Sequence, residues 1–212
     1  MLAKKTEERA IMKKETRISV LISGGGTNLQ SVIDEMEAGN LLNGKIVQII
    51  ASKADAYGLE RGKKHGIPTK VISKVEYPDM EERMAAVLKA LDDEETDLVV
   101  LAGYLSILSP ELIKKYNKRI LNIHPSLLPK FGGKGCYGLR VHEQVVAAGE
   151  KESGATVHFV DEGIDTGEII IQGKVEVLPE DTPEDLQKRV LVQEHRILPE
   201  AIRMVIKEKG WF

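Results

Sequence analysis

Short apolar runs alternate with longer segments in which apolar residues recur every three or four positions. The short runs predict buried strands at 17–22, 45–51, 69–72, 98–102 and 120–123. The longer segments predict helices at about 28–38, 56–65, 79–92 and 109–116. Strands that alternate with helices in this way are typical of an open, mostly parallel sheet with helices on both faces. We therefore predict an α/β, Rossmann-like fold.

The pattern changes in the last third of the chain. Four glycines fall within 132–138, and a helix is expected at 139–148. Two apolar runs at 156–160 and 168–177, joined by a short acidic loop, predict an antiparallel strand element at the end of the sheet. Thr182 followed by Pro183 and two acidic residues is typical of a helix start, and this last helix is expected to run toward Lys209 with a bend at Pro199.

The first 16 residues differ from the rest, with eight charged residues and no strand pattern. We predict a charged N-terminal extension at 1–16 and a single domain at 17–212. Two interpretations of the extension stay open. Met12 is the original start in one of them, and the other is a leading helix over 3–14, which contains neither glycine nor proline.

Composition narrows the class of protein. The 212 residues are 42% hydrophobic and 30% charged, with a formal net charge of −3, so there is no basic footprint for nucleic acid. The sequence shows neither an 18-residue apolar run nor a signal peptide, so no membrane association is expected. Cys136, the single cysteine, has no histidine beside it, which disfavours a catalytic thiol. We expect a cytoplasmic protein.

A glycine-rich loop from Ser23 to Asn28 joins the first strand to the first helix. Glycines let backbone N–H groups approach an anion, and the N-terminus of the helix adds a favourable dipole. We interpret the loop as a site for one phosphate, with a plain tight turn capped by Thr27 or Asn28 as the alternative. A dinucleotide site is disfavoured, because Leu29 replaces the third glycine of that motif and no acid ends the second strand.

Asn122 and His124 lie where the fifth strand ends, and strand alternation places both on the same face. An amide and an imidazole aimed together can stabilise a developing oxyanion. A lone histidine at a strand end is more often a packing or capping residue, but the Asn-x-His pair favours the catalytic interpretation.

Asp165 lies in the acidic loop that follows the run ending in His158 and Phe159. A carboxylate at this place could orient an imidazole and keep it charged. Two alternatives remain open on these residues alone. One is an ordinary acidic loop, and the other is a metal site formed by His124, His158 and Asp165.

Four stretches resemble the folate-dependent glycinamide ribonucleotide formyltransferases: 22–29, 101–104, 122–129 and 157–165. The resemblance runs in order over about 17–206. The stretch 122–129 is typical of folate-dependent formyl transfer in general, and the glycine-rich loop is typical of the purine-pathway member. The resemblance implies that 10-formyltetrahydrofolate, as co-substrate, donates its formyl group to the amine of glycinamide ribonucleotide without a metal. It is compatible with a monomer or a homodimer.

The resemblance also implies a role for individual residues. Asn122 and His124 would bind the formyl oxygen, and Asp165 would raise the basicity of His124. The remaining implied contacts are with the ribonucleotide phosphate (Gly26, Thr27 and Asn28), its glycinamide or ribose end (Glu194), and the folate (Leu105, Ser106, Ile107, Leu108, Asn122 and His158). Members also bend sharply after the active-site strand, so the Leu128–Pro129 peptide is expected to be cis.

The chain departs from the family at several positions. Many relatives carry an arginine in place of Ser106 and another near Met80, whereas the nearest arginine here is Arg83. Leu191 stands where some relatives have a polar contact with the substrate, and the segment 132–140, longer than in several relatives, has no assigned role.

Other functions fit the sequence less well. Methionyl-tRNA formyltransferase shares the central motif but needs a tRNA-binding domain, and only one helix is expected after Val177. Formyltetrahydrofolate hydrolysis usually comes with a regulatory domain that 16 residues cannot form. The broken glycine motif disfavours a nicotinamide oxidoreductase, and a non-catalytic nucleotide-binding module remains a further alternative.

Overall fold

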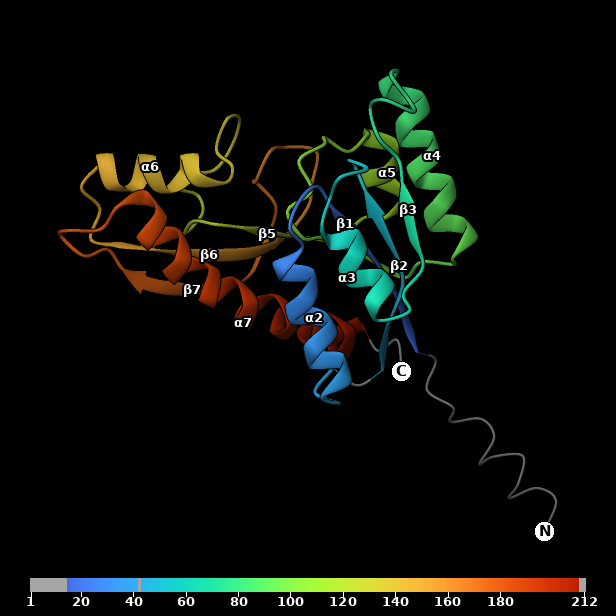
Figure 1. Cartoon of the computed structure of the whole chain (residues 1–212), viewed down its shortest axis with the longest axis horizontal. Helices are drawn as coiled ribbons and strands as arrows, with labels where there is room; N and C mark the ends of the chain where they lie inside the picture. The colour runs from blue at the N-terminus through green and yellow to red at the C-terminus, as the bar shows by residue number, and fades with distance from the viewer. Residues whose placement is uncertain (1–14, 42, 210–212) are drawn as a thin grey trace, which may run out of the picture.

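One twisted sheet organises the chain in the computed structural model, which describes residues 15–41 and 43–209 (Figure 1). Its seven strands lie in the order β3-β2-β1-β4-β5-β6-β7. In chain order they are β1 (Thr16–Ile22), β2 (Gly44–Ala51), β3 (Thr69–Val71), β4 (Leu98–Leu101), β5 (Ile120–His124), β6 (Glu152–Phe159) and β7 (Ile169–Glu176). Strands β1 to β5 pair in parallel, and β6 and β7 pair antiparallel. The predicted fold class is therefore confirmed.

Helices cover both faces of the sheet. They are α2 (Thr27–Glu37), α3 (Gly58–Lys64), α4 (Met80–Asp93), α5 (Pro110–Lys115), α6 (Leu139–Ala147) and α7 (Pro183–Lys209). Alternation along β1 divides the core, because Ile18, Val20 and Ile22 pack with α2, α3, α6 and α7, whereas Leu21 packs with α4 and α5. None of these helices, within the described ranges, is long and apolar enough to cross a membrane.

Strand pairing brings the predicted site residues together. Strands β1, β4 and β5 are neighbours and parallel, so their carboxyl ends open onto the same edge of the sheet. Strand β6 runs the opposite way beside β5, and its register places His158 directly opposite Asn122. Side chains opposite each other on adjacent strands are close enough to interact. The pairing thus brings the fifth strand and the acidic loop into contact.

Most elements begin and end within two residues of their predicted positions, and β6 is the main exception. It begins at Glu152 rather than 156, because the small residues Gly154 and Ala155 pair with β7 although they carry no strand pattern. A Cβ on Gly154 would lie 2.0 Å from the Gly173 carbonyl oxygen, so this close pairing requires glycine.

The remaining predictions concern the two ends of the chain and one peptide bond. Helix α7 continues from Pro183 to Lys209 with Pro199 inside it. The predicted cis peptide at Leu128–Pro129 is confirmed. The alternatives for the N-terminal extension concern 1–14, which lie outside the described residues.

Candidate active site

The glycine-rich loop leads directly into α2 and packs against α3. Gly26 precedes the helix with φ of 69°, a left-handed conformation that favours glycine, and no side chain caps the helix N-terminus. A Cβ on Gly26 would lie 2.7 Å from the Gly58 Cα, and the Gly58 N–H donates to the Gly24 carbonyl oxygen at 3.1 Å. The first N–H groups of α2 have no acceptor within the helix, as an anion site requires.

Asn28 and Glu194, two predicted substrate residues far apart in sequence, meet beside this loop. The Asn28 amide donates to a carboxylate oxygen of Glu194 at 2.6 Å, which joins α2 to α7. Both side chains are nearly buried. Burial raises the pKa of Glu194, and the hydrogen bond from Asn28 opposes that rise. The structure therefore gathers the predicted ribonucleotide residues in one place.

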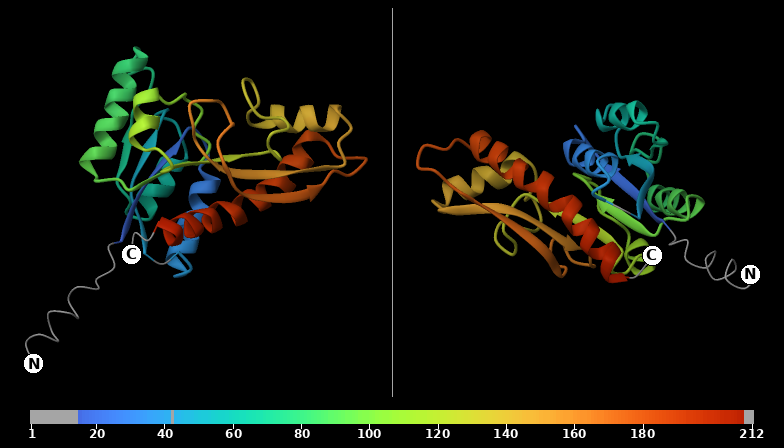
Figure 2. Two further views of the ribbon diagram at one scale, coloured as in Figure 1. Left: turned by 180° about the vertical axis from the view of Figure 1, so that it is seen from behind. Right: turned by 90° about the horizontal axis from the view of Figure 1, so that it is seen from below.

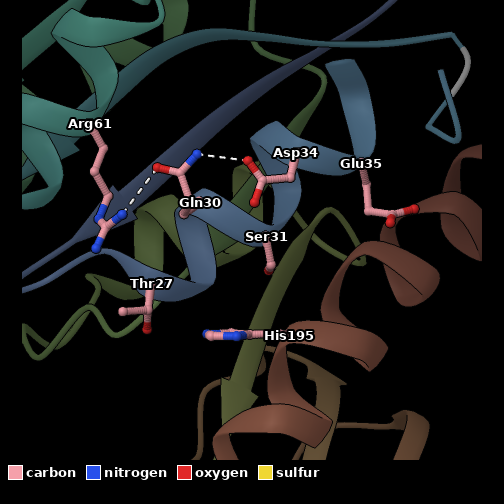
Figure 3. A pocket seen from close by; sticks show the side chains of 7 residues that line it. All are labelled: Thr27, Gln30, Ser31, Asp34, Glu35, Arg61 and His195. Atoms are coloured by element: carbon pink, nitrogen blue, oxygen red, sulfur yellow. Dashed lines mark hydrogen bonds between the residues drawn. The ribbon is translucent and has the colours of Figure 1, made fainter. Parts of the chain in front are cut away.

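A hollow of about 330 Å³, lined by polar and charged residues, adjoins the loop at Thr27 between α2, α3 and α7 (Figure 3). Arg61 reaches it from α3, donating from Nε to the Gly25 carbonyl oxygen at 2.8 Å and from Nη1 to Gln30 at 3.1 Å. His195 enters from α7, and its Nε2 is buried without a hydrogen-bond partner among the described residues. Sequence reasoning missed Arg61 and His195, since neither lies in a recognisable motif.

The predicted folate segment follows β4 and is tied to the glycine-rich loop. The Leu105 N–H donates to the Ser23 hydroxyl at 2.9 Å. Leu105 and Ile107 expose 58% and 66% of their surface, whereas Leu108 is buried. Exposed apolar side chains at this edge of the sheet interact more favourably with a flat aromatic ring than with water.

Asn122, His158 and Asp165 form a compact cluster. The Asn122 amide nitrogen lies 3.1 Å from His158 Nε2 and 3.5 Å from Asp165 Oδ1. The His158 Nδ1 lies 2.8 Å from the Phe159 carbonyl oxygen, which can only accept, so Nδ1 carries a proton. His158 Nε2 then accepts from Asn122 when the ring is neutral.

His124 completes the cluster from the end of β5. Its Nδ1 lies 3.5 Å from Asp165 Oδ2, and its Nε2 lies 2.9 Å from the Phe131 carbonyl oxygen. Asp165 raises the pKa of His124, as expected, but it does not decide the net direction in the unliganded protein. Burial lowers the pKa of His124, and this effect outweighs the opposite effects of Asp165 and the Phe131 carbonyl. The carboxylate acts in the predicted direction, but the desolvation of the ring is the larger effect.

Asp165 is held in a conformation that side chains rarely adopt. Its φ is 58°, and its Oδ2 accepts from the Gly133 N–H at 3.0 Å. Burial alone would raise the pKa of Asp165, but hydrogen bonding with His158 and Gly133 and the nearby histidines lower it overall. The carboxylate is thus kept charged between the two imidazoles.

The metal alternative gains no support from this geometry. Asp165 lies between the rings of His124 and His158, at 3.5 and 3.6 Å. Among the residues that the structure describes, no group of three or more histidine, cysteine or acidic side chains is arranged to hold an ion.

The family is decided by comparison with known proteins. A family model described as formyl transferase matches residues 16–202. This chain belongs to the formyl transferase family. The predicted class, an enzyme of formyl transfer, is confirmed, and the formyltransferase fold matches known structures. The crystal structure of glycinamide ribonucleotide transformylase 1 from Symbiobacterium toebii is similar, with a TM-score of 0.86 and 44% identity over 92% of this chain and 89% of that one.

Curated relatives of this formyltransferase differ in length. The phosphoribosylglycinamide formyltransferase of Haemophilus influenzae is 43% identical over 88% of this chain and 85% of its own length. A chloroplastic phosphoribosylglycinamide formyltransferase of Arabidopsis thaliana is 40% identical over 92% of this chain and 67% of its own. This chain spans only 14% of the trifunctional purine biosynthetic protein adenosine-3 of Drosophila melanogaster, at 40% identity. The predicted family resemblance is confirmed.

Proposed function

We propose that this formyltransferase moves the formyl group of 10-formyltetrahydrofolate to the primary amine of glycinamide ribonucleotide, a step in the synthesis of the purine nucleotide IMP. One observation carries the proposal. Asn122 Nδ2 and His124 Nδ1 both lie 3.5 Å from the Asp165 carboxylate, at the sheet edge onto which the glycine-rich loop also opens. The names of the relatives, found at about 40% identity, agree with it.

In this proposal the ribonucleotide lies along the glycine-rich loop. Backbone N–H groups at Gly26, Thr27 and Asn28 bind its phosphate, since they begin α2 without a side-chain cap. Glu194 binds the ribose or glycinamide end, and its bond to Asn28 keeps it beside the phosphate.

The folate binds along the segment after β4. Its ring packs on the exposed Leu105 and Ile107, and the backbone of Ser106 and Leu108 supplies hydrogen bonds. Asn122 and His158, paired across β5 and β6, line the inner end of the same site.

The reaction needs groups that hold charge and move a proton. The amine attacks the formyl carbon, and Asn122 and His124 stabilise the oxyanion that forms. His124 is poorly protonated before substrate binds because it is buried. A negative oxyanion beside the ring offsets the cost of charging the buried imidazole. His124 is therefore protonated as the oxyanion forms in the transition state. A water near Asp165 takes the amine proton, and collapse of the oxyanion breaks the bond between the formyl carbon and the folate nitrogen. That nitrogen takes the proton, so the folate leaves as a neutral amine.

The proposal also covers the domain bounds, the oligomeric state, the location and the partners of the enzyme. The formyltransferase domain covers 17–212 and includes Thr16 as the first residue of β1, and the residues before it form an extension outside the catalytic unit. The enzyme works as a monomer or a homodimer on small-molecule substrates in the cytoplasm. Nucleic acid and membranes are not partners, since the chain carries a net charge of −3.

Competing acceptors test the proposal directly. The protein is mixed with 10-formyltetrahydrofolate and glycinamide ribonucleotide, methionyl-tRNA or no amine, and the folate absorbance is followed. We expect turnover with the ribonucleotide alone. Equal turnover without an amine would indicate a hydrolase, and turnover with the tRNA would indicate the other family activity.

A further inference from the structure

One backbone turn contacts both members of the His124–Asp165 pair. The Phe131 carbonyl oxygen lies 2.9 Å from His124 Nε2, and the Gly133 N–H donates to Asp165 Oδ2 at 3.0 Å. Gly133 belongs to the segment 132–140, to which the sequence assigned no role, and Phe131 immediately precedes that segment. Because His124 and Asp165 are nearly enclosed, with 5% and 12% of their side chains exposed, water cannot easily replace either contact.

We propose that the turn Phe131–Gly133 is a positioning element that fixes which nitrogen of His124 exchanges its proton. The Phe131 carbonyl keeps a proton on Nε2. The proton that His124 donates and takes back during the reaction is therefore the one on Nδ1. The Gly133 N–H keeps Asp165 charged and aimed at that same nitrogen. This inference rests on the proposed function only for its catalytic consequence.

The groups around the His124 ring decide which of its nitrogens is protonated. A neutral imidazole carries one N–H, whereas the imidazolium carries two. A carbonyl oxygen cannot donate, so the short contact with Phe131 requires the proton to be on Nε2. The bare Nδ1 of the neutral ring then faces the Asp165 carboxylate at 3.5 Å, which is unfavourable until a second proton arrives. An ordinary aspartate–histidine pair would instead hold its single proton on Nδ1, facing the carboxylate.

Nδ1 also faces the reacting groups. The carboxylate oxygens of Asp165 lie 3.5 Å from both Asn122 Nδ2 and His124 Nδ1. Both nitrogens therefore border the same carboxylate, and the proposed function places the formyl oxygen beside them. A proton on Nδ1 can be transferred there while Nε2 stays bonded to Phe131.

Other titratable groups near His124 do not change this assignment. From β6, His158 is neutral when its Nε2 accepts from Asn122, and its charge would oppose a charge on His124. From α6, the buried His142 has a pKa lowered to about 4, so it is neutral at physiological pH. Among the described residues, Asp165 is then the only group whose charge favours a charge on the ring.

The turn is built from backbone conformations that few residues adopt. Phe131 has φ of 55° and Gly133 has φ of 94°. Between them, a Cβ on Gly132 would lie 2.5 Å from Leu128 Cδ2 and 3.3 Å from the Asp165 Cβ. Glycine at 132 therefore lets the turn approach the carboxylate closely enough for its neighbours to make both contacts.

The tautomer of His124 in the unmodified protein tests the proposal without any substrate. Long-range ¹⁵N NMR correlations over a pH titration distinguish a proton on Nε2 from one on Nδ1. We expect the neutral ring to carry its proton on Nε2. A neutral ring with the proton on Nδ1 would overturn the proposal, even if formyl transfer itself were established.

A matched pair of glycine substitutions tests the second contact. Gly133→Ala and Gly135→Ala both place alanine at positive φ, 94° and 89°, and neither new Cβ would meet an atom within 4 Å. Only Gly133 contacts Asp165. We expect Gly133→Ala to move the His124 titration and the basic limb of the pH–rate profile to lower pH, with kcat falling by about tenfold on that limb for a shift of one pKa unit. Gly135→Ala should leave both near wild type.

The result decides the role of the turn. Equal shifts in the two variants, or no shift of the His124 titration in a folded Gly133→Ala, would overturn the role of Gly133. If Gly133→Ala does not fold, the tautomer of the unmodified protein decides the proposal. Absence of formyl transfer in wild type would refute the proposed function alone, since the NMR titration is independent of substrates.

Discussion

His124 shows how two opposing effects meet in one side chain. Burial disfavours its charged form, while Asp165 and the Phe131 carbonyl favour it, and burial is the larger effect in the unliganded protein. When the oxyanion forms, it offsets part of the effect of burial, and the charged and neutral forms of His124 become close in free energy. The charge on Asp165 therefore matters most at that point. This balance makes the pair sensitive to the loss of a single charge.

Replacing Asp165 with asparagine keeps the shape of the side chain and removes its charge. The pKa of His124 then falls further, because only the Phe131 carbonyl still favours the imidazolium. We expect kcat to fall by roughly 10²–10⁴-fold, the usual contribution of a positioned acid–base group. The basic limb of the pH–rate profile should move to lower pH, and the KM for the ribonucleotide should change little. Near-normal turnover would return Asp165 to an ordinary loop carboxylate.

A double substitution tests whether the two residues act together. His124→Ala should reduce kcat at least as much as Asp165→Asn, and the double variant should be barely worse than His124→Ala alone. Strictly multiplicative losses would show that the two residues act independently.

His142 on α6 gives the stability a predictable pH dependence. It is 1% exposed, and burial lowers its pKa from 6.5 to about 4, assisted by repulsion from His124. The unfolded chain binds this proton near pH 6.5, whereas the folded chain does not until about pH 4. Keeping His142 neutral therefore contributes fully to the free energy of unfolding above pH 6.5, and this contribution is lost as the pH falls toward 4.

His142→Leu should remove this dependence. We expect the free energy of unfolding of wild type to fall by about 3 kcal/mol more than that of the variant between pH 7 and pH 4. Urea unfolding at both pH values measures the difference. The same pH dependence in the two proteins would mean that His142 titrates normally in the folded state.

At the scale of elements, the contact between the glycine-rich loop and α3 limits what can stand at position 26. A side chain there would meet the Gly58 Cα at 2.7 Å and would also require a strained φ of 69°. Gly24, two residues earlier in the same loop, has open space around it. The loop therefore offers a variant and its control within three positions.

Gly26→Val should displace the start of α2 and the N–H groups proposed to bind phosphate. We expect a large rise in the KM for the ribonucleotide, little change in the KM for the folate, and little effect of Gly24→Ala on either. Steady-state kinetics with each substrate varied in turn measures this. An equal rise for both substrates would indicate that the loop is purely structural.

The sequence predicts which side chains lie at the ends of strands and helices, but it does not predict which backbone N–H and carbonyl groups contact them. Strand alternation predicted that Asn122 and His124 share a face. The periodic segments predicted helices from about 79 and 109, where Asp79 and Ser109 cap α4 and α5 in the structure. The contacts of Phe131 and Gly133 were missed, because backbone groups have no signature in the residue type. Arg61 was missed because its partners lie 31 and 36 residues away, which no local pattern reveals.

At the scale of the whole molecule, α7 holds the two parts of the sheet together. Figure 2 shows it running along one face, from the antiparallel end to the start of β1. It packs against β6 and β7 and also against α2 and α6. Glu194 lies on this helix and accepts a hydrogen bond from Asn28 beside the glycine-rich loop. The helix therefore connects the antiparallel end of the sheet to that loop.

The whole protein also offers a test of the metal alternative. We expect full activity after exhaustive treatment with a chelator and no stoichiometric metal in the purified protein, measured by atomic emission. Loss of turnover that zinc or iron restores would favour the metal site formed by His124, His158 and Asp165.

The first strand and the last helix bring the ends of the described chain to the same side. Ile18 of β1 and Ile206 of α7 both reach 3.2 Å from the position of a Cβ on Gly44, and Figure 1 shows α7 ending near the start of β1. A unit with adjacent ends can be inserted between other domains, or closed and reopened at a surface loop, without stretching either connection. Circular permutation that joins the two ends should therefore be tolerated.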